Sequence, residues 1–160
     1  MHPLRKLISN KQLLGLIAQE YGTPVYIYSQ QRIEKNVSSL KNALSANFDK
    51  FHICYAIKSN SNPHLIKAMR NSFSKIGGDC SSPGEIYAAE LSGIKPSECI
   101  YTGNYESETD LIEAVQKGCN INLDDITSLN RLSKIAIPDR ISFRMNPGFG
   151  GGSYSGIITG

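Results

Sequence analysis

The 160-residue chain is predicted to adopt an α/β fold with parallel strands, because short strand-like runs alternate with helical patterns along most of its length. The runs recur about every twenty residues and end near Lys58, Asp79, Thr102, Asp124 and Asn146. A helix between two consecutive strands is the usual crossover that makes them parallel. Two architectures satisfy this alternation, an open doubly wound sheet and a (β/α)8 barrel. No Gly-x-Gly-x-x-Gly motif follows the first strand, which argues against the dinucleotide-binding form of the open sheet.

The N-terminal elements precede this alternation. Residues 10–21 have apolar side chains at helical spacing and stop at Gly22, which predicts a helix. Residues 24–28 alternate as a strand does. Residues 29–48 again show helical periodicity, with Ser29 as the N-cap.

The helices expected between the later strands have clear start signals. Asn62 and Pro63 supply an N-cap and a proline at the first helical position. Ser82 is followed three residues later by Glu85, and a second serine-acid pair of the same spacing lies further along the chain, so both fit a capping box or a close variant. The predicted helices are residues 63–73, 83–92, 108–117 and 126–135.

Composition and charge exclude several classes of function. The net charge of +3 and the absence of a long basic run argue against a nucleic-acid-binding protein. No apolar stretch approaches the length of a membrane span or of a signal-peptide core. The four cysteines form no Cys-x-x-Cys pair, so reduced thiols in a cytoplasmic protein are expected, and no metal site is predicted. They are Cys54, Cys80, Cys99 and Cys119.

Lys58 is the residue most suggestive of chemistry. It closes the strand-like run 51–58, and the carboxyl ends of strands are where α/β folds place their active sites. An amine partly withdrawn from water at such a place is suited to form a covalent link with a carbonyl. A lysine that extends from a strand end into solvent explains the position equally well.

Four stretches of the chain resemble motifs of one enzyme family, in the same order. Tyr55-Ala56-Ile57-Lys58-Ser59-Asn60 resembles the Tyr-Ala-x-Lys-Ala-Asn segment of the fold-type III pyridoxal-phosphate (PLP) decarboxylases. The other three are Tyr21-Gly22-Thr23-Pro24-Val25-Tyr26-Ile27-Tyr28, Gly78-Asp79-Cys80-Ser81-Ser82-Pro83-Gly84-Glu85 and Phe143-Arg144-Met145-Asn146-Pro147. The first of these three is most similar to the diaminopimelate branch of the family.

The resemblance implies a partial (β/α)8 TIM barrel of the alanine racemase-like PLP type. About five of the eight strands are expected in this chain, which would make it an N-terminal part. Residues 1–28 would be a helix and strand that in the family join a C-terminal β-domain, and residues 29–160 would be the first portion of the PLP-binding barrel. The C-terminal β-domain is expected to be absent from the chain.

The resemblance also implies the roles of five site residues. Lys58 would hold PLP and act as the catalytic residue, and Asp79 and Arg144 would contact the cofactor. Glu85 would lie near the cofactor, although the capping box explains this glutamate equally well. Asp79 could instead close a strand-helix loop. Asn146 would lie on the substrate side of the barrel mouth, next to Arg144.

The function implied by the resemblance is decarboxylation of meso-2,6-diaminopimelate to L-lysine and CO2, in a homodimer. The 160 residues alone are expected to be inactive, because later segments of the family supply further cofactor contacts. Decarboxylation of ornithine, arginine or carboxynorspermidine is an alternative. A non-catalytic PLP-binding barrel protein and a catalytically dead remnant are two more.

Overall fold

The computed structural model describes residues 8–104 and 106–145. The chain divides into two compact units, and each is described by itself. The first comprises the described residues of Met1–Ile53 together with Asn62–Ile76, and the second comprises those of Cys54–Ser61 and Gly77–Gly160.

Among the described residues, the first unit contains helices α2, α3 and α4, and the caps predicted at Ser29 and Asn62 begin the last two of them. Helix α2 (Lys11–Tyr21) is capped by the Asn10 side chain, and helix α3 (Gln30–Ser45) by the Ser29 hydroxyl, which accepts from the amide of Arg32. Helix α4 (Pro63–Ser72) is capped by Asn62, with Pro63 at its first turn. Helices α3 and α4 pack together. The predictions for residues 10–21, 29–48 and 63–73 are confirmed within the usual uncertainty of helix ends.

The predicted strand at residues 24–28 is wrong, because these residues belong to no helix or strand in the structure. Their alternating pattern fits a strand, but a strand also needs a partner to complete its hydrogen bonds. No described residue supplies that partner. The apolar side chains consequently stay in solvent, and Tyr26 is 87% exposed.

The second unit is built on a five-stranded sheet in which strand order follows chain order, β1-β2-β3-β4-β5. The pairs β2/β3, β3/β4 and β4/β5 are parallel. A doubly wound sheet reverses its strand order at a switch point, whereas here each new strand adds to the same edge. The order is that of part of a (β/α)8 barrel. The strands are β1 (Ile53–Ala56), β2 (Ile76–Cys80), β3 (Cys99–Tyr101), β4 (Asn120–Leu123) and β5 (Ile141–Phe143).

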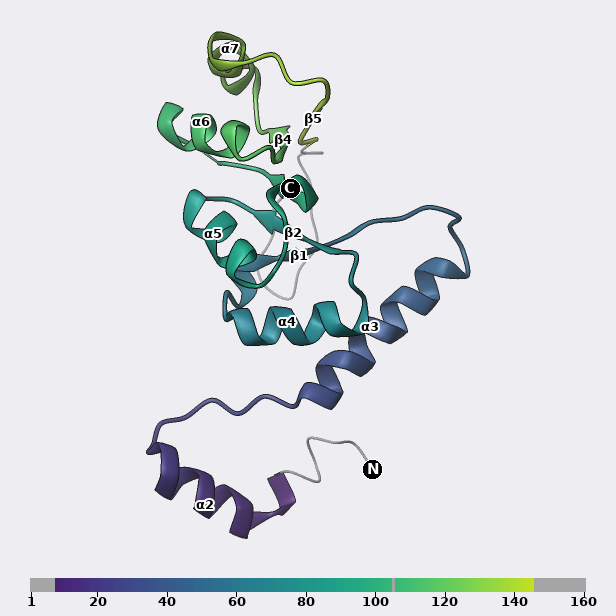
Figure 1. Ribbon diagram of the computed structural model, residues 1–160, viewed down its shortest axis with the longest axis vertical. Helices are drawn as coiled ribbons and strands as arrows, with labels where there is room; N and C mark the ends of the chain where they lie inside the picture. The colour runs from purple at the N-terminus through teal and green to yellow at the C-terminus, as the bar shows by residue number, and fades with distance from the viewer. Residues whose placement is uncertain (1–7, 105, 146–160) are drawn as a thin grey trace. The chain divides into compact units, whose positions relative to one another are not determined.

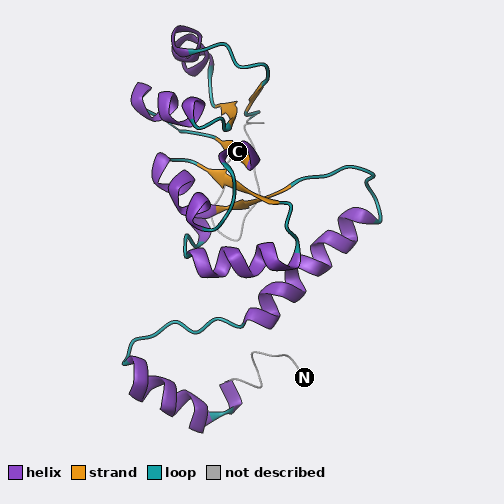
Figure 2. Cartoon of the chain, viewed as in Figure 1, coloured by secondary structure: helices purple, strands orange, loops and turns teal. Residues whose placement is uncertain are grey.

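The helices that follow β2, β3 and β4, namely α5, α6 and α7, lie one after another along one side of the sheet (Figures 1 and 2). Helix α6 begins with a full capping box, in which Ser107 and Asp110 each accept a hydrogen bond from the backbone amide of the other. Helix α7 is capped by Asp125, which accepts from the amide of Ser128 at 2.7 Å. The three helices are α5 (Pro83–Leu91), α6 (Glu108–Gln116) and α7 (Ile126–Ile135), as the sequence predicted.

The two faces of the sheet differ in character. On the face toward the helices, alternate strand residues are apolar and no more than 3% exposed; they are Cys80, Cys99, Tyr101, Ile121 and Leu123. Buried residues of the helices complete this core, among them Ile86, Ala89, Leu111, Ala114 and Leu132. The intervening strand residues point to the opposite face and include Asp79, Asn122 and Ser142. In a closed barrel this polar face lines the interior.

None of the helices in the described ranges has the length and apolar character needed to cross a membrane.

Candidate active site

A cavity of about 770 Å³ lies in the second unit, over the polar face of the sheet. Its lining comes from the inward-facing residues of all five strands and from the segments that follow them. Ten residues form it: Cys54, Lys58, Asp79, Ser81, Ile100, Thr102, Asn104, Asn122, Ser142 and Arg144. Three of the predicted site residues, Lys58, Asp79 and Arg144, therefore meet at one cavity.

Lys58 lies just beyond the strand rather than at its last position. Strand β1 ends at Ala56, and Lys58 is the middle residue of a 3₁₀ turn, Ile57–Ser59. Ile57 is fully buried and the turn packs against α5, so an apolar residue that appears to continue the strand instead anchors the turn. The Tyr55 hydroxyl donates to the Asn60 carbonyl at 3.3 Å across this turn. The exposed Lys58 amine is thus held at the cavity by a short, fixed segment.

Asp79 is the penultimate residue of β2, half-buried and opposite Ile100 in the register. The negative charge of Asp79 affects the pKa of the neighbouring Cys54 thiol. Burial is the main cause that raises the pKa of Cys54 to about 11, and the Asp79 carboxylate and Cys99 raise it further. The Cys54 thiol is therefore protonated at neutral pH and contributes a small, uncharged surface to the cavity.

Arg144 follows β5 and is fixed by contacts at three places. Its amide donates to the Leu123 carbonyl at 2.8 Å, which extends the β4/β5 ladder by one residue. Its Nη1 donates to Oδ1 of Asn104 at 3.2 Å and lies 3.5 Å from Oδ1 of Asp124. Sequence reasoning missed Asn104 and Asp124 as contacts of Arg144. The position of Asp124 directly after a strand was a usable signal, whereas Asn104 lies in a loop that carried none.

A ladder of polar side chains crosses the cavity floor and was also missed. The Ser142 hydroxyl donates to Oδ1 of Asn122 at 2.7 Å. The Asn122 amide in turn donates to the Thr102 hydroxyl at 3.0 Å. Polar residues that alternate with buried apolar ones in β4 were the available signal.

Glu85 and Asn146 are the remaining predicted site residues. The Glu85 carboxylate accepts from the amide of Ser81 at 2.9 Å and from its hydroxyl at 3.0 Å. The helix start is therefore a variant of the capping box, because the amide bound by Glu85 is that of Ser81 and not of the N-cap Ser82. Glu85 does not line the cavity, but it holds Ser81, which does. Asn146 lies outside the described residues.

The arrangement defines a class of site. A primary amine and a guanidinium face the same cavity as one carboxylate, with neutral hydrogen-bonding groups between them. Such a set suits an anionic ligand that carries a reactive carbonyl, since the amine can add to the carbonyl and the guanidinium can bind an anion. No group of three or more potential metal ligands occurs among residues 8–104 and 106–145.

The chain belongs to the pyridoxal-dependent decarboxylase family, because residues 30–160 match the family model described as "Pyridoxal-dependent decarboxylase, pyridoxal binding domain". It is 41% identical over 146 residues to a diaminopimelate decarboxylase of Methanothermobacter thermautotrophicus, and 40% identical over 144 residues to one of Thermoplasma acidophilum. Each alignment covers 90% of this chain, and 33% and 34% of the respective relatives. The chain thus spans about a third of the length of the curated relatives it matches.

A solved structure of similar fold supports the same family. The crystal structure of diaminopimelate decarboxylase from Helicobacter pylori complexed with L-lysine is 30% identical, with a TM-score of 0.76. The similarity covers 86% of this chain and 35% of that one. The predicted family and fold class, a partial TIM barrel of the PLP type, are confirmed.

The residues at the cavity fit PLP, the cofactor of the family. PLP carries an aldehyde and a phosphate, and Lys58 and Arg144 supply an amine and a cationic group that match them. Asp79 limits the excess positive charge of the cavity. The fit rests on the chemistry of these three groups.

Proposed function

We propose that this chain is the pyridoxal-binding part of a diaminopimelate decarboxylase, which converts meso-2,6-diaminopimelate to L-lysine and CO2. The observation that carries the proposal is the convergence of Lys58, Asp79 and Arg144 on one cavity at the ends of parallel strands. The relatives at 40 and 41% identity, which bear that name, support the choice of substrate.

Each residue has a distinct task in this proposal. PLP, when bound, withdraws the electron pair that is left on the α-carbon after CO2 departs. Lys58 holds the cofactor through its amine and is then placed to return a proton to that carbon. Arg144 binds an anionic group of cofactor or substrate. Asp79 supplies a negative charge at the cavity that can pair with a cationic group of the bound ligand.

The polar floor and the capping contacts support these groups. The ladder of Ser142, Asn122 and Thr102 fixes neutral hydrogen-bonding groups below the ligand and leaves no charge there. Glu85 acts indirectly, by holding Ser81 at the cavity edge. Asn146 contacts the substrate.

The wider organisation is also part of the proposal. The protein functions as a homodimer in the cytoplasm, and residues 1–28 pair with a C-terminal β-domain of the kind found in the family. The exposed apolar side chains of residues 25–28 support this pairing, because they need a cover.

The test is product formation by the protein expressed from its complete gene. With PLP and meso-diaminopimelate we expect L-lysine and CO2, and no comparable turnover of L-ornithine or L-arginine. Lys58→Ala is expected to abolish turnover, whereas Lys95→Ala, in an exposed turn, serves as the matched control. Turnover of ornithine or arginine in place of diaminopimelate would overturn the proposed substrate. PLP binding without any turnover would favour a non-catalytic carrier.

A further inference from the structure

Three polar side chains tie the ends of three neighbouring strands together beside the cavity. Arg144 follows β5, Asp124 follows β4, and Asn104 lies in the loop after β3. The Arg144 guanidinium reaches past the end of β4 to bond Asn104, and it lies within ion-pair distance of Asp124 on the way. The side chain is therefore held along the rim of the sheet.

The geometry of these contacts orients the guanidinium and leaves part of it available. Within residues 8–104 and 106–145, both side-chain contacts of Arg144 use Nη1. Its Nη2 and Nε remain available to an anion there. A guanidinium presents its N–H groups in a rigid fork, so fixing one nitrogen fixes the direction of the others.

The ion pair between Arg144 and Asp124 contributes little to the stability of the fold. The two side chains are 30 and 35% exposed and their atoms are 3.5 Å apart, and pairs of this kind contribute little to folding. Removal of either partner should leave the fold intact. The consequence of the contact is the direction in which Arg144 points.

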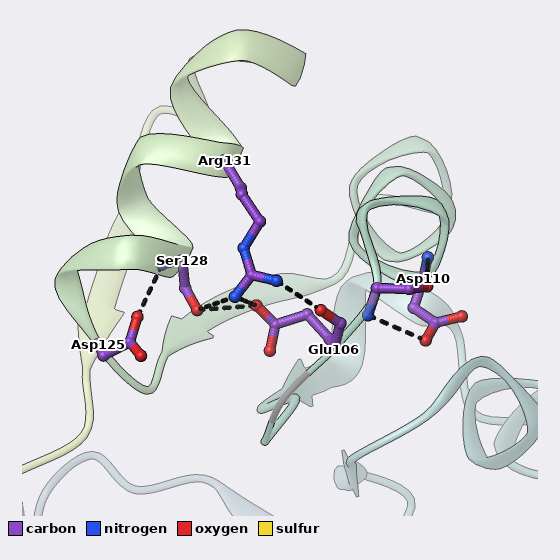
Figure 3. A network of polar contacts seen from close by, with 6 residues as sticks. Glu106, Asp110, Asp125, Ser128 and Arg131 are labelled. Atoms are coloured by element: carbon purple, nitrogen blue, oxygen red, sulfur yellow. Dashed lines mark hydrogen bonds and ion pairs between the residues drawn. The ribbon is translucent and has the colours of Figure 1, made fainter.

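Two residues after Asn104 in the chain, Glu106 takes part in a second set of contacts, the Glu106 cluster, which consists of Glu106, Ser128 and Arg131 (Figure 3). The Ser128 hydroxyl donates to Oε1 of Glu106 at 2.8 Å, and Arg131 Nη1 donates to the Glu106 carbonyl at 2.7 Å. Arg131 Nη2 also lies 3.6 Å from Oε1. The Glu106 side chain is only 4% exposed, so Glu106 is fixed to α7 through a buried carboxylate.

Gly103 fixes the same loop on the other side of Asn104. A β-carbon at position 103 would come within 2.6 Å of both Cβ and Oε2 of Glu106. The glutamate can fold back over the loop only because residue 103 has no side chain. Asn104 thus lies between a required glycine and a buried, paired glutamate.

We infer that Asn104 and Asp124 are positioning residues, which hold the Arg144 guanidinium toward the anionic ligand of the cavity, and that the Glu106 cluster fixes Asn104 for this purpose. The inference rests on the proposed function for the identity of that ligand as PLP or its amino-acid substrate. The contacts themselves do not depend on it.

The experiment is a double-mutant cycle in the protein expressed from its complete gene. Asn104→Ala and Asp124→Ala are each combined with Arg144→Ala, or with Arg144→Lys if the alanine variant does not fold. Each is measured for the PLP dissociation constant, kcat/KM and Tm. Glu90→Ala is the control, because Glu90 pairs with Lys117 and its loss removes a paired carboxylate that is not part of the cavity lining.

Each single variant is expected to weaken PLP binding or lower kcat/KM about tenfold, the usual effect of one hydrogen bond to a charged group. In the Arg144 variants the same substitutions should change these quantities less than about twofold, because the effect passes through Arg144. Asn104→Asp retains an acceptor oxygen and should restore part of the loss. The Tm of the Asn104 and Asp124 variants should stay close to that of the wild type. The Glu90→Ala control should keep the wild-type PLP affinity and kcat/KM.

A second readout separates this inference from the proposed function. The rate at which hydroxyphenylglyoxal modifies Arg144, followed by peptide mapping, reports whether the guanidinium is held, with or without PLP. Release by Asn104→Ala or Asp124→Ala should accelerate the reaction in the Lys58→Ala background too. The inference would be overturned if Asn104→Ala and Asp124→Ala left the modification rate of Arg144 at its wild-type value and if their losses of PLP affinity and kcat/KM multiplied fully with those of the Arg144 variants. Absence of PLP binding in the wild type would overturn only the proposed function.

Discussion

Ser128→Ala should loosen α7 by an amount that the contacts of Ser128 allow us to work out. The hydroxyl is in a residue only 1% exposed, and it donates to Glu106 at 2.8 Å and accepts from Arg131 at 3.3 Å. A hydrogen bond to a charged group contributes about 1.5–3 kcal/mol, and the better helix propensity of alanine returns about 0.5 kcal/mol. The net expected loss is about 2 kcal/mol, or roughly a thirtyfold increase in the opening of the helix.

The assay is hydrogen exchange of the α7 amides followed by mass spectrometry, because it reports local opening in a protein of any size. Ser133→Ala is the matched control. Ser133 is on the same helix, but it is exposed and its hydroxyl bonds only the Asn130 carbonyl of its own helix in the described contacts. Ser133→Ala should leave protection unchanged or slightly increased. Equal effects of the two substitutions would refute the reasoning, since the buried contact with Glu106 would then contribute nothing.

Four further predictions follow from other parts of the structure. Arg144→Ala should lower turnover and PLP affinity tenfold or more, on the order of one lost charged hydrogen bond, with little change in Tm. A large fall in Tm that accompanies the loss of turnover would mean that Arg144 is structural. Gly103→Ala should lower Tm because of the clash with Glu106, whereas Gly15→Ala, which meets no atom within 4 Å, should not. The Ser128 amide and other helix contacts lower the pKa of Asp125, so its stabilisation of α7 is present above the unfolded pKa near 3.8 and is lost as pH falls through the folded value. Asp125→Asn should remove that acid-induced loss of protection in hydrogen exchange. The 160-residue chain made alone should form no L-lysine from diaminopimelate, and formation above a Lys58→Ala control would contradict this.

The helices and their alternation with strands could be predicted from sequence because each segment contains its own signals, whereas the choice of a barrel over an open sheet came from the family resemblance. The caps at Ser107 and Asp125 and the proline at position 63 mark helix starts by local chemistry alone. The apolar residues between them repeat at the period of their element. Such signals do not depend on what the element packs against, so they survive in a sequence read without a structure.

The errors arose where a residue's environment decides its conformation. Ile57 looks like a further strand residue, but its burial against α5 anchors a turn, and Lys58 therefore lies beyond the strand. The segment 24–28 has the pattern of a strand without a partner among the described residues. In both cases the local pattern is real, and a tertiary contact or its absence overrides it.

In the candidate site, too, some residues could be predicted from local sequence signals and others depend on tertiary contacts. Lys58, Asp79 and Arg144 could be predicted because they end or follow strands and match family motifs. Asn104 could not, because its role depends on a reach across two strand ends that no spacing reveals. Glu106 was equally hidden, since a glutamate in a loop normally lies in solvent and this one is buried by partners on the following helix.

The most direct test of the account is to locate the covalent attachment of PLP. The protein expressed from its complete gene is incubated with PLP, reduced with borohydride, digested and mapped by mass spectrometry. Our account predicts that the reduced adduct is on Lys58, because Lys58 is the amine that lines the described cavity together with Asp79 and Arg144. A specific adduct on another lysine, or none on the protein at saturating PLP, would contradict it.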